Sequence, residues 1–350
     1  MFDSPTWPSL IAALLDGDDL SISDSTWAME QVMRGEATPS QLAGFLVALR
    51  AKGETVGEIV GFRDAVLDHA VPLSIDSNVL DIVGTGGDRL KTVNISTGAS
   101  IIAAAADAKV VKHGNRAASS ASGSSDVLAA LGIDLSIDPA AVTRVFDEVG
   151  ITFVYAAAFH PGFRHAATAR SDLGVPTVFN FLGPLCNPVR PEANAVGVAR
   201  VEVVPLMVGV FQTRGATALV FRGDDGLDEL STTGHSHIWE VTGGAVTEHD
   251  LDPRDLGIPR ASLSDLVGGT PADNAKTLRS ALDGTAGPVR DIMLLNAAAG
   301  LVAWDLSRDP SRIDTPILER LADGMERAAN AVDTGAAAAK LDAWVRAARS

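Results

Sequence analysis

The chain has 350 residues, of which 46% are hydrophobic, and a formal net charge of −16. That length allows one large domain or two moderate ones, and the composition is typical of a globular protein with a sizeable core. The acidic balance argues against nucleic acid as the main partner, because phosphate backbones are bound by clusters of Lys and Arg. An anionic ligand must therefore be held locally, by backbone amides, a metal ion and a few cations.

We expect no segment of the given sequence to direct the protein to a membrane. No Lys or Arg precedes Arg34, so the N-terminus lacks the layout of a signal peptide. No uninterrupted apolar run reaches membrane-spanning length. We therefore expect a cytoplasmic protein without membrane contact. Cys186 is the only cysteine, and we expect a small buried hydrophobic residue there rather than a nucleophile.

The N-terminal fifth of the chain is expected to be entirely helical. Thr38 and Gln41 form a capping box, and Thr55 with Glu58 repeats it at the start of the next helical segment. Four short helices without a strand indicate a small α-helical domain that ends at a linker near Pro72.

After this linker, short apolar runs alternate with helical segments. Such alternation is typical of a largely parallel sheet covered by helices. Strands are expected at 79–83, 108–112, 151–155, 194–198 and 216–221, with an antiparallel pair at 237–242 and 245–249; helices are expected at 98–106, 124–131, 139–149, 203–213, 272–283, 288–303 and 315–348.

Residues 162–190 interrupt this alternation with glycines, prolines and no clear strand. We expect this region to leave the sheet and rejoin the helical domain. The fold class is therefore α/β, with a small all-α domain (1–72 plus about 165–190) and a large α/β domain (73–164 and 191–350). The central sheet of the large domain is expected to be mainly parallel and covered by helices.

A glycine-rich turn follows the first expected strand. Gly84, Gly86 and Gly87 carry no Cβ, so their backbone N–H groups can converge on an anion, and Asp88 comes next. The turn lacks the third glycine of a dinucleotide-binding fingerprint, because Arg89 stands there, and it is not a Walker loop. A tight strand-to-helix turn without a ligand is the alternative interpretation.

Polar residues then lead into an apolar helix. Thr92, Asn94, Ser96 and Thr97 lie just before or at its start. Orphan N–H groups and the positive end of the helix dipole favour a negative charge at that place. Together with the glycine turn, these residues predict a cradle for a polyphosphate.

A second polar loop follows the next expected strand and again precedes a helix. Lys112 and Arg116 supply cations, and Ser119, Ser120 and Ser124 supply hydroxyl donors. The carboxyl ends of parallel strands meet at one edge of a sheet, so both loops are expected at the same ligand-binding edge. A solvated polar loop is the alternative.

A third cluster holds four carboxylates within six residues after the strand expected at 216–221. Asp224, Asp225, Asp228 and Glu229 repel one another unless a cation is present. Mg²⁺ typically takes one or two carboxylates together with substrate phosphates and waters, so this loop is a candidate magnesium site. A charged solvated turn is the alternative.

Two further features carry weaker signals. His160 follows the strand expected at 151–155, and Arg170 could hold a carboxylate with its forked guanidinium. A lone histidine before a proline is more often structural. His235 and His237 lack companion ligands at metal spacing.

In combination these motifs resemble the anthranilate phosphoribosyltransferase family. The resemblance is ordered along the chain and runs from roughly residue 30 to 305. It rests on Gly84–Asp88, Asn94–Thr97, Lys112–Arg116, His160 with Pro161, Arg170, Leu173 with Gly174, Phe179 with Asn180, Leu182–Leu185, Asn187 with Pro188, and Gly226–Glu229.

The resemblance implies a homodimer built through the small domain, and transfer of phosphoribose from phosphoribosyl pyrophosphate (PRPP) to the amine of anthranilate in tryptophan biosynthesis. It implies two Mg²⁺ ions per subunit, one on Ser96 and Glu229 and one on Asp228 and Glu229. It implies contacts with anthranilate from Gly84, Asn115, His113, His160 and Arg170. The residues implied for PRPP are Gly84, Gly87, Asp88, Thr92, Asn94, Ile95, Ser96, Thr97, Lys112, His113, Gly114, Asn115, Arg116, Ala117, Ala118, Ser119, Ser120 and Ser124.

The chain departs from the family pattern in two places. Tyr155, Ala156 and Ala157 stand where the family commonly has Phe-Ala-Pro, and Pro176 stands where it commonly has Arg. The first change leaves the exact shape of the anthranilate entrance open.

The reaction expected from these residues is displacement at the ribose C1 with pyrophosphate as the leaving group. Mg²⁺ and backbone amides would stabilise the developing charge. An aromatic amine is neutral at pH 7, so His113 or water would suffice to remove a proton, and Arg170 would orient anthranilate.

Three alternatives stay open at this point. A nucleoside phosphorylase of the same fold has a similar glycine loop. A purine-type phosphoribosyltransferase of another fold has two acids followed by Thr-Gly, whereas Gly226 and Leu227 follow Asp225 here. A nucleic-acid-binding relative of the fold would need a Lys/Arg stripe, which the sequence lacks.

Overall fold

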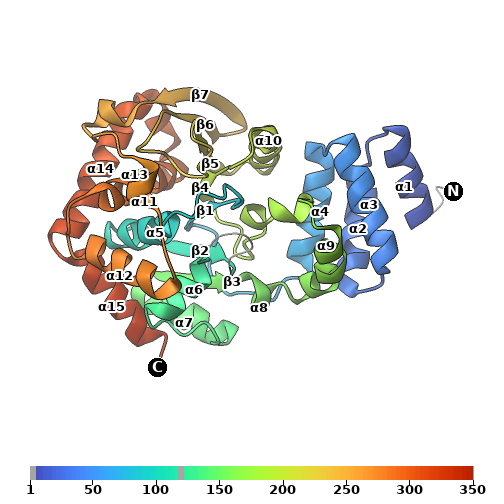
Figure 1. Cartoon of the computed structure of the whole chain (residues 1–350), viewed down its shortest axis with the longest axis horizontal. Coiled ribbons are helices and arrows are strands. Elements are labelled where there is room, and N and C mark those ends of the chain that lie inside the picture. The colour runs from blue at the N-terminus through green and yellow to red at the C-terminus, as the bar shows by residue number, and fades with distance from the viewer. Residues whose placement is uncertain (1–4, 117–121, 350) are drawn as a thin grey trace.

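The computed structural model describes residues 5–116 and 122–349, and it consists of a small helical part and a larger α/β part (Figure 1). Thr6, Ser21, Thr38 and Thr55 cap the four helices of the small part, and the two predicted capping boxes are present. These helices are α1 (Trp7–Asp16), α2 (Ile22–Arg34), α3 (Pro39–Lys52) and α4 (Val56–Asp68).

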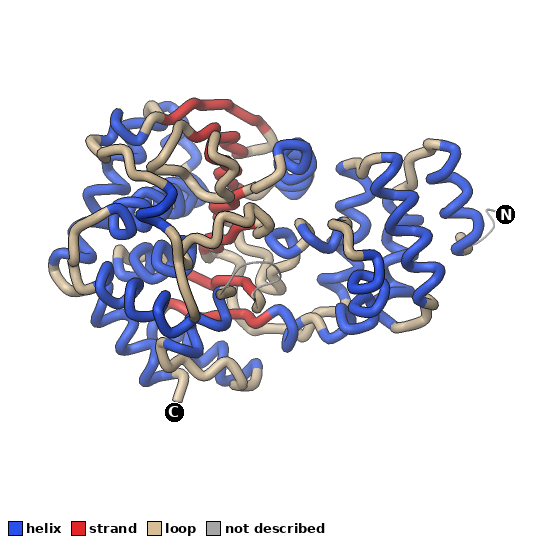
Figure 2. The backbone as a smooth tube through the Cα atoms, viewed as in Figure 1, coloured by secondary structure: helices blue, strands red, loops and turns tan. Residues whose placement is uncertain are grey.

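A seven-stranded sheet forms the centre of the larger part (Figure 2). The strand order is β3-β2-β1-β4-β5-β6-β7, with the first five strands parallel and the last two antiparallel to their neighbours. The α/β fold class with a mainly parallel sheet is therefore confirmed. The strands are β1 (Leu80–Gly84), β2 (Val110–Gly114), β3 (Ile151–Tyr155), β4 (Ala193–Gly197), β5 (Thr217–Gly223), β6 (Ser236–Thr242) and β7 (Ala245–Leu251).

Helices cover the sheet as the alternating pattern predicts. Most of them begin and end within a few residues of the expected positions. They are α5 (Ile95–Ala105), α6 (Ser124–Ala130), α7 (Pro139–Val149), α10 (Val204–Arg214), α11 (Leu263–Leu266), α12 (Pro271–Leu282), α13 (Pro288–Arg308), α14 (Ile317–Asp333) and α15 (Ala336–Ala347).

The expectation of one helix over 315–348 is wrong. The chain forms α14 and α15 instead, and Thr334 and Gly335 separate them. Gly335 has a φ of 78°, a left-handed conformation that glycine adopts without a steric penalty and that ends the first helix.

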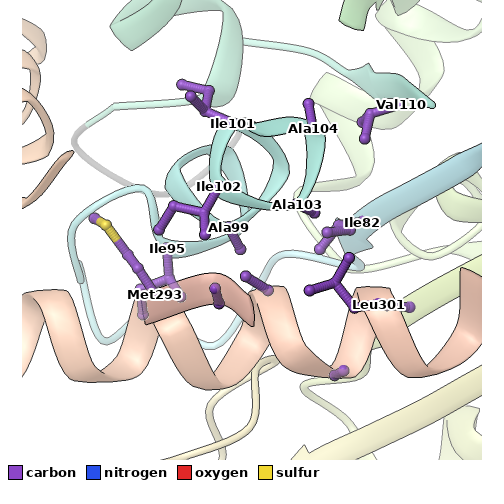
Figure 3. Packing of buried hydrophobic residues seen from close by; sticks show 14 of the residues in the cluster. Ile82, Ile95, Ala99, Ile101, Ile102, Ala103, Ala104, Val110, Met293 and Leu301 are labelled. Carbon is purple, nitrogen blue, oxygen red and sulfur yellow. The ribbon is translucent and has the colours of Figure 1, made fainter. Parts of the chain in front are cut away.

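The first-turn position of α5 is fixed by its packing on α13. Figure 3 shows Ile95, Ala99 and Ile102 against Met293. The two helices approach so closely that a Cβ on Gly98 would lie 2.5 Å from the Met293 Sδ atom. Helix α5 therefore begins at Ile95, three residues before the expected start, and its opening turn contains Ser96 and Thr97.

The segment between β3 and β4 leaves the sheet and packs on the helical part. It contains α8 (Ala156–Phe159) and α9 (Ala167–Leu173), and α9 contacts α3 (Figure 1). Phe179, Phe181 and Cys186 belong to the same apolar cluster as the side chains of the small helices. Cys186 is buried, as expected, and burial raises the pKa of its thiol. The domain boundaries given above stay predictions.

None of the helices formed by residues 5–116 and 122–349 is long and apolar enough to cross a membrane.

Candidate active site

The glycine turn after β1 lies at the carboxyl edge of the sheet and meets the acidic loop. Gly86 and Gly87 have φ values of 71° and 92°, which glycine adopts freely. The Gly86 N–H donates to the Asp228 Oδ2 atom at 2.7 Å. The Leu90 N–H donates to the Asp88 Oδ1 atom at 3.2 Å, so Asp88 is held within the turn.

Two glycines let the acidic loop cross this edge. Gly84 and Gly197 are register partners at the ends of β1 and β4. A Cβ on Gly197 would lie 1.6 Å from the Asp228 carbonyl oxygen, and a Cβ on Gly84 would lie 2.1 Å from the Asp228 Oδ2 atom. Any larger residue at either position would displace the loop. The sequence reasoning found Gly84 and missed Gly197, whose role depends on a contact between distant segments.

The four acids of this loop differ in burial and in hydrogen-bond partners. Asp224 is exposed. Asp225 accepts hydrogen bonds from the hydroxyls of Ser231, at 2.6 Å, and Thr233, so it stabilises the loop itself. Asp228 and Glu229 are buried beside the phosphate-cradle residues.

Burial and repulsion between neighbouring carboxylates raise the pKa values of Asp228 and Glu229. Burial and then the charge of Asp88 raise the pKa of Asp228 from 3.8 to about 7. Burial and then Asp228 raise the pKa of Glu229 well above its ordinary value. The Ser96 N–H donates to the Glu229 Oε1 atom at 3.1 Å, which ties the acid to the first turn of α5. A cation at this place would relieve the repulsion.

The donor set fits a hard cation that takes most of its ligands from elsewhere. Among residues 5–116 and 122–349, no group of three or more His, Cys, Asp or Glu side chains could hold a metal ion by itself. Asp228, Glu229 and the Ser96 hydroxyl together offer a partial set of oxygen ligands. That is the arrangement Mg²⁺ uses when substrate phosphates and waters complete its coordination.

Lys112 supplies a cation inside the same site. It lies in β2 rather than in the following loop, and its side chain is buried. The ammonium group donates to the Ile82 carbonyl oxygen and, at 3.2 Å, to the Ser96 hydroxyl. Burial lowers the pKa of Lys112, while Asp81 and Glu229 act in the opposite direction. Asp88, Lys112 and Glu229 thus converge at one edge of the sheet.

His113 and His160 form a buried pair. Their rings meet edge to face with centroids 5.2 Å apart, and the His113 Nδ1 atom lies 3.0 Å from the Gly183 carbonyl oxygen. Burial and then His160 lower the pKa of His113 to about 3, and burial lowers that of His160 to about 4. Both rings are neutral at pH 7, so His113 would be a weak base.

Asp81 and Asn187 support the strand that carries His113, and the sequence reasoning assigned them no role in the site. The Asp81 carboxylate accepts from the backbone N–H of His113 at 3.1 Å and from the Asn187 Nδ2 atom at 3.0 Å. Burial raises the pKa of Asp81 to about 6. A carboxylate buried in a strand gives no motif signal, because its partners lie far away in sequence.

A chain of aromatic contacts leads from the histidines to Arg170. Phe163 contacts His160 at 5.3 Å and Phe179 at 5.8 Å between ring centroids. The Arg170 guanidinium lies 5.2 Å from the centroid of the Phe179 ring. Arg170, on α9, faces a cavity of about 440 Å³ that it lines together with Arg89 of the glycine turn.

The polar residues before α5 are held by a segment that the sequence reasoning did not single out. Thr92 forms an isolated bridge with Val267. The Asn94 Oδ1 atom accepts from the Asn274 Nδ2 atom at 2.9 Å, and the Asn94 Nδ2 atom donates to the Ser122 carbonyl oxygen at 3.0 Å. The Asn94 side chain thereby connects α12 to the second polar loop.

The second polar loop is described in part. Gly114 ends β2, and Asn115 and Arg116 are exposed beyond it. The Ser124 hydroxyl donates to the Asn115 carbonyl oxygen at 3.3 Å, which holds the start of α6 against the loop. Ala117, Ala118, Ser119 and Ser120 lie outside the described residues.

Two family models match consecutive parts of the chain. The helical bundle domain of a glycosyl transferase family matches residues 8–70, and the α/β domain of a glycosyl transferase family matches residues 76–338. The anthranilate phosphoribosyltransferase of Leifsonia xyli subsp. xyli is 66% identical over 349 residues, with 100% of both chains covered.

The chain belongs to the anthranilate phosphoribosyltransferase family.

Other members agree over the full length. The anthranilate phosphoribosyltransferase of Thermobifida fusca is 55% identical and covers 97% of this chain and 96% of its own. The crystal structure of the anthranilate phosphoribosyltransferase from Thermus thermophilus has a TM-score of 0.88 at 38% identity, covering 97% of this chain and 99% of that one. The Saccharomyces cerevisiae enzyme in complex with PRPP and Mg has a TM-score of 0.87 at 28% identity, with 98% of each chain covered. The sequence-based resemblance is confirmed.

Proposed function

We propose that this protein transfers the phosphoribosyl group of PRPP to the amine of anthranilate and releases pyrophosphate, in tryptophan biosynthesis. The observation that carries this function is the convergence of Asp88, Lys112 and Glu229 at one sheet edge in a chain that matches the family over its whole length. The Saccharomyces cerevisiae relative has been solved with PRPP and Mg and with 4-fluoroanthranilate, which are ligands of these two classes.

The diphosphate of PRPP would be held mainly by backbone donors. The glycine turn and the first turn of α5 meet at this edge of the sheet, where an anion is favoured. The Gly86 and Ser96 N–H groups donate to Asp228 and Glu229, so the remaining N–H groups would face the diphosphate. Lys112, in β2, would add a positive charge to these donors. The full proposed set for PRPP is Gly84, Gly87, Asp88, Thr92, Asn94, Ile95, Ser96, Thr97, Lys112, His113, Gly114, Asn115, Arg116, Ala117, Ala118, Ser119, Ser120 and Ser124.

Two Mg²⁺ ions per subunit complete the proposal. Ser96 and Glu229 would hold one ion, and Asp228 and Glu229 the other. When bound, Mg²⁺ neutralises charge on the diphosphate and on the leaving pyrophosphate. The chain's own part is to keep both carboxylates close to the glycine turn, and the Gly86 and Ser96 N–H groups do this by donating to them.

Anthranilate would enter through the cavity beside α9. Arg170 would bind its carboxylate, with the guanidinium oriented by the Phe179 ring. Gly84, Asn115, His113 and His160 would face its ring and amine. The two substrates would be bound by different parts of the chain. The reaction rate would then rise because the enzyme holds the two substrates close together in the correct orientation.

The reaction needs little help from a base. The aromatic amine is already neutral at pH 7, and the pKa of His113 is lowered to about 3 by burial. Water is therefore the better candidate for removing the proton after the C1–N bond forms. His113 would act by contact with the substrates and as a hydrogen-bonding neutral ring.

The resemblance to the family also implies how the protein assembles and where it is located. We propose a homodimer formed through the small domain (residues 1–72 with about 165–190), and a cytoplasmic location that suits a biosynthetic enzyme. Size-exclusion chromatography with light scattering tests the dimer, since a monomer at micromolar concentration would contradict it.

One assay tests the activity. Purified protein is mixed with PRPP, anthranilate and Mg²⁺, and the loss of anthranilate fluorescence is followed. The proposed function predicts turnover that requires both substrates and stops in EDTA. A parallel reaction with pyrimidine nucleosides and phosphate tests the nucleoside phosphorylase alternative, and turnover in that reaction alone would replace the proposed function.

A further inference from the structure

Two arginines line the cavity beside α9. Arg170 comes from α9, which packs on the helical part, and Arg89 comes from the turn after β1 in the larger part. The cavity holds about 440 Å³. The residues that line it are Arg89, Ala167, Arg170, Ser171, Gly174, Val175, Pro176 and Asn180.

Neither arginine is neutralised by the part of the chain that the structure describes. No carboxylate of residues 5–116 or 122–349 forms an ion pair with Arg89 or Arg170. In a chain of net charge −16, many other arginines have such a partner, as Arg320 has in Glu240. Two unpaired cations on one cavity repel each other and attract an anion.

Arg89 is also held in an unusual backbone conformation. Its φ is 61°, in the left-handed region that glycine occupies without cost and that other residues rarely adopt. Strain of this kind clusters at active sites and at loops that hold ligands. Lys91 has a φ of 56° in the same turn, but it does not line the cavity. The two residues therefore differ in position and share the strain.

The walls of the cavity indicate the class of anion. Ala167, Val175 and Pro176 contribute apolar surface to a lining that also contains Ser171, Asn180 and the two arginines. The ring of an aromatic acid can pack against these three residues while its carboxylate binds an arginine. The dimensions are also within the range of small-molecule sites.

We infer that Arg89 is a second carboxylate-binding cation, which captures the carboxylate of anthranilate together with Arg170. This inference rests on the proposed function and adds to it a residue from the PRPP side of the cleft. The glycine turn would then contact both substrates, with its amides on the diphosphate and with the Arg89 guanidinium on the aromatic acid.

The test compares Arg89→Gly with Lys91→Gly. Each variant removes one positive charge and one strained non-glycine residue from the same turn, so they differ mainly in access to the cavity. Anthranilate KM is measured at saturating PRPP and Mg²⁺, and PRPP KM at saturating anthranilate. We expect Arg89→Gly to raise the anthranilate KM roughly threefold to tenfold, in line with one charge-assisted contact from an exposed arginine, and to leave the PRPP KM within a factor of two. Lys91→Gly should change neither KM by more than a factor of two.

Three further readouts separate binding from folding. The Tm of Arg89→Gly should not fall below that of the wild type, because glycine accepts a φ of 61°. Inhibition by 2-aminobenzamide, which has no carboxylate, should be the same in the wild type and in Arg89→Gly. Higher salt should weaken anthranilate binding more in the wild type than in Arg89→Gly. Salt screens the charge of Arg89, and the variant lacks that charge.

Several results would overturn the inference. Equal effects of the two substitutions on the anthranilate KM would show a general loop effect, and a matching rise in PRPP KM would assign Arg89 to the diphosphate. Direct titration of the protein with anthranilate by fluorescence keeps the two proposals distinguishable. If the wild type binds anthranilate through Arg89 but does not turn it over with PRPP, the proposed function fails and the inference stands.

Discussion

Replacing Asp228 by asparagine should stabilise the protein while it removes magnesium-dependent activity. Burial and Asp88 raise the pKa of Asp228 to about 7 in the folded chain, against 3.8 in the unfolded one. The stability associated with this bound proton is fully present below about pH 3.8 and is lost as the pH rises through about 7. The asparagine side chain has no carboxylate to ionise, so the stability of the variant does not fall for this reason as the pH rises.

The size of the effect follows from the pKa difference. A tenfold change in proton affinity is worth about 1.4 kcal/mol, so pKa values of 3.8 and about 7 correspond to about 4 kcal/mol at pH 8. The same difference gives about 2 kcal/mol at pH 5, where most of the folded protein keeps the proton. With an unfolding entropy of about 0.7 kcal/mol/K for a chain of 350 residues, the Tm should rise by about 6 °C at pH 8.

Differential scanning fluorimetry in EDTA measures this shift at pH 8 and pH 5. The matched control is Asp224→Asn, because Asp224 belongs to the same loop and is exposed. It should move the Tm by less than about 1 °C. Asp228→Asn should also lose at least about a hundredfold in turnover with Mg²⁺. An unchanged or lower Tm at pH 8, or an equal shift at both pH values, would refute the electrostatic reasoning.

Three other predictions address neighbouring parts of the site. Gly197→Ala should destabilise the protein by about 3 kcal/mol or more in chemical denaturation and abolish turnover, because its Cβ would lie 1.6 Å from the Asp228 carbonyl oxygen; an active, stable variant would mean that the acidic loop can move aside. Arg170→Ala should raise the anthranilate KM far more than the PRPP KM in steady-state kinetics, and equal rises would place Arg170 elsewhere. Lys112→Met should weaken PRPP binding at least about tenfold in calorimetry, since it removes a buried cation beside Ser96, and an unchanged Kd would exclude Lys112 from the cradle.

Much of the fold could be predicted because its signals are local. The capping boxes at Thr38 and Thr55 and the short apolar runs of the strands are legible within a few residues. The helix start at Ile95 was misplaced by three residues because contact with α13 decides it. The break at Gly335 was missed because an isolated glycine is compatible with a continuous helix.

The candidate site likewise contains residues that the sequence indicates and residues that only the tertiary structure reveals. The glycine turn and the acid pair are contiguous in sequence, so their composition alone indicated a phosphate and a cation. The supporting residues Asp81, Gly197 and Asn274 act through partners that are far away along the chain. Only the tertiary structure shows that Asp225 accepts a hydrogen bond from within its own loop, whereas Asp228 accepts one from the glycine turn of the site.

The central claim is that a strongly acidic protein holds a sugar diphosphate with backbone donors, one buried lysine and magnesium held by an acid pair. Isothermal titration of the wild type with PRPP, with Mg²⁺ and then in EDTA, tests it most directly. We expect a saturable one-site isotherm with Mg²⁺ and at least about tenfold weaker binding in EDTA. Equal affinity under the two conditions would contradict the claim, because the acid pair would then face the diphosphate without a cation between them.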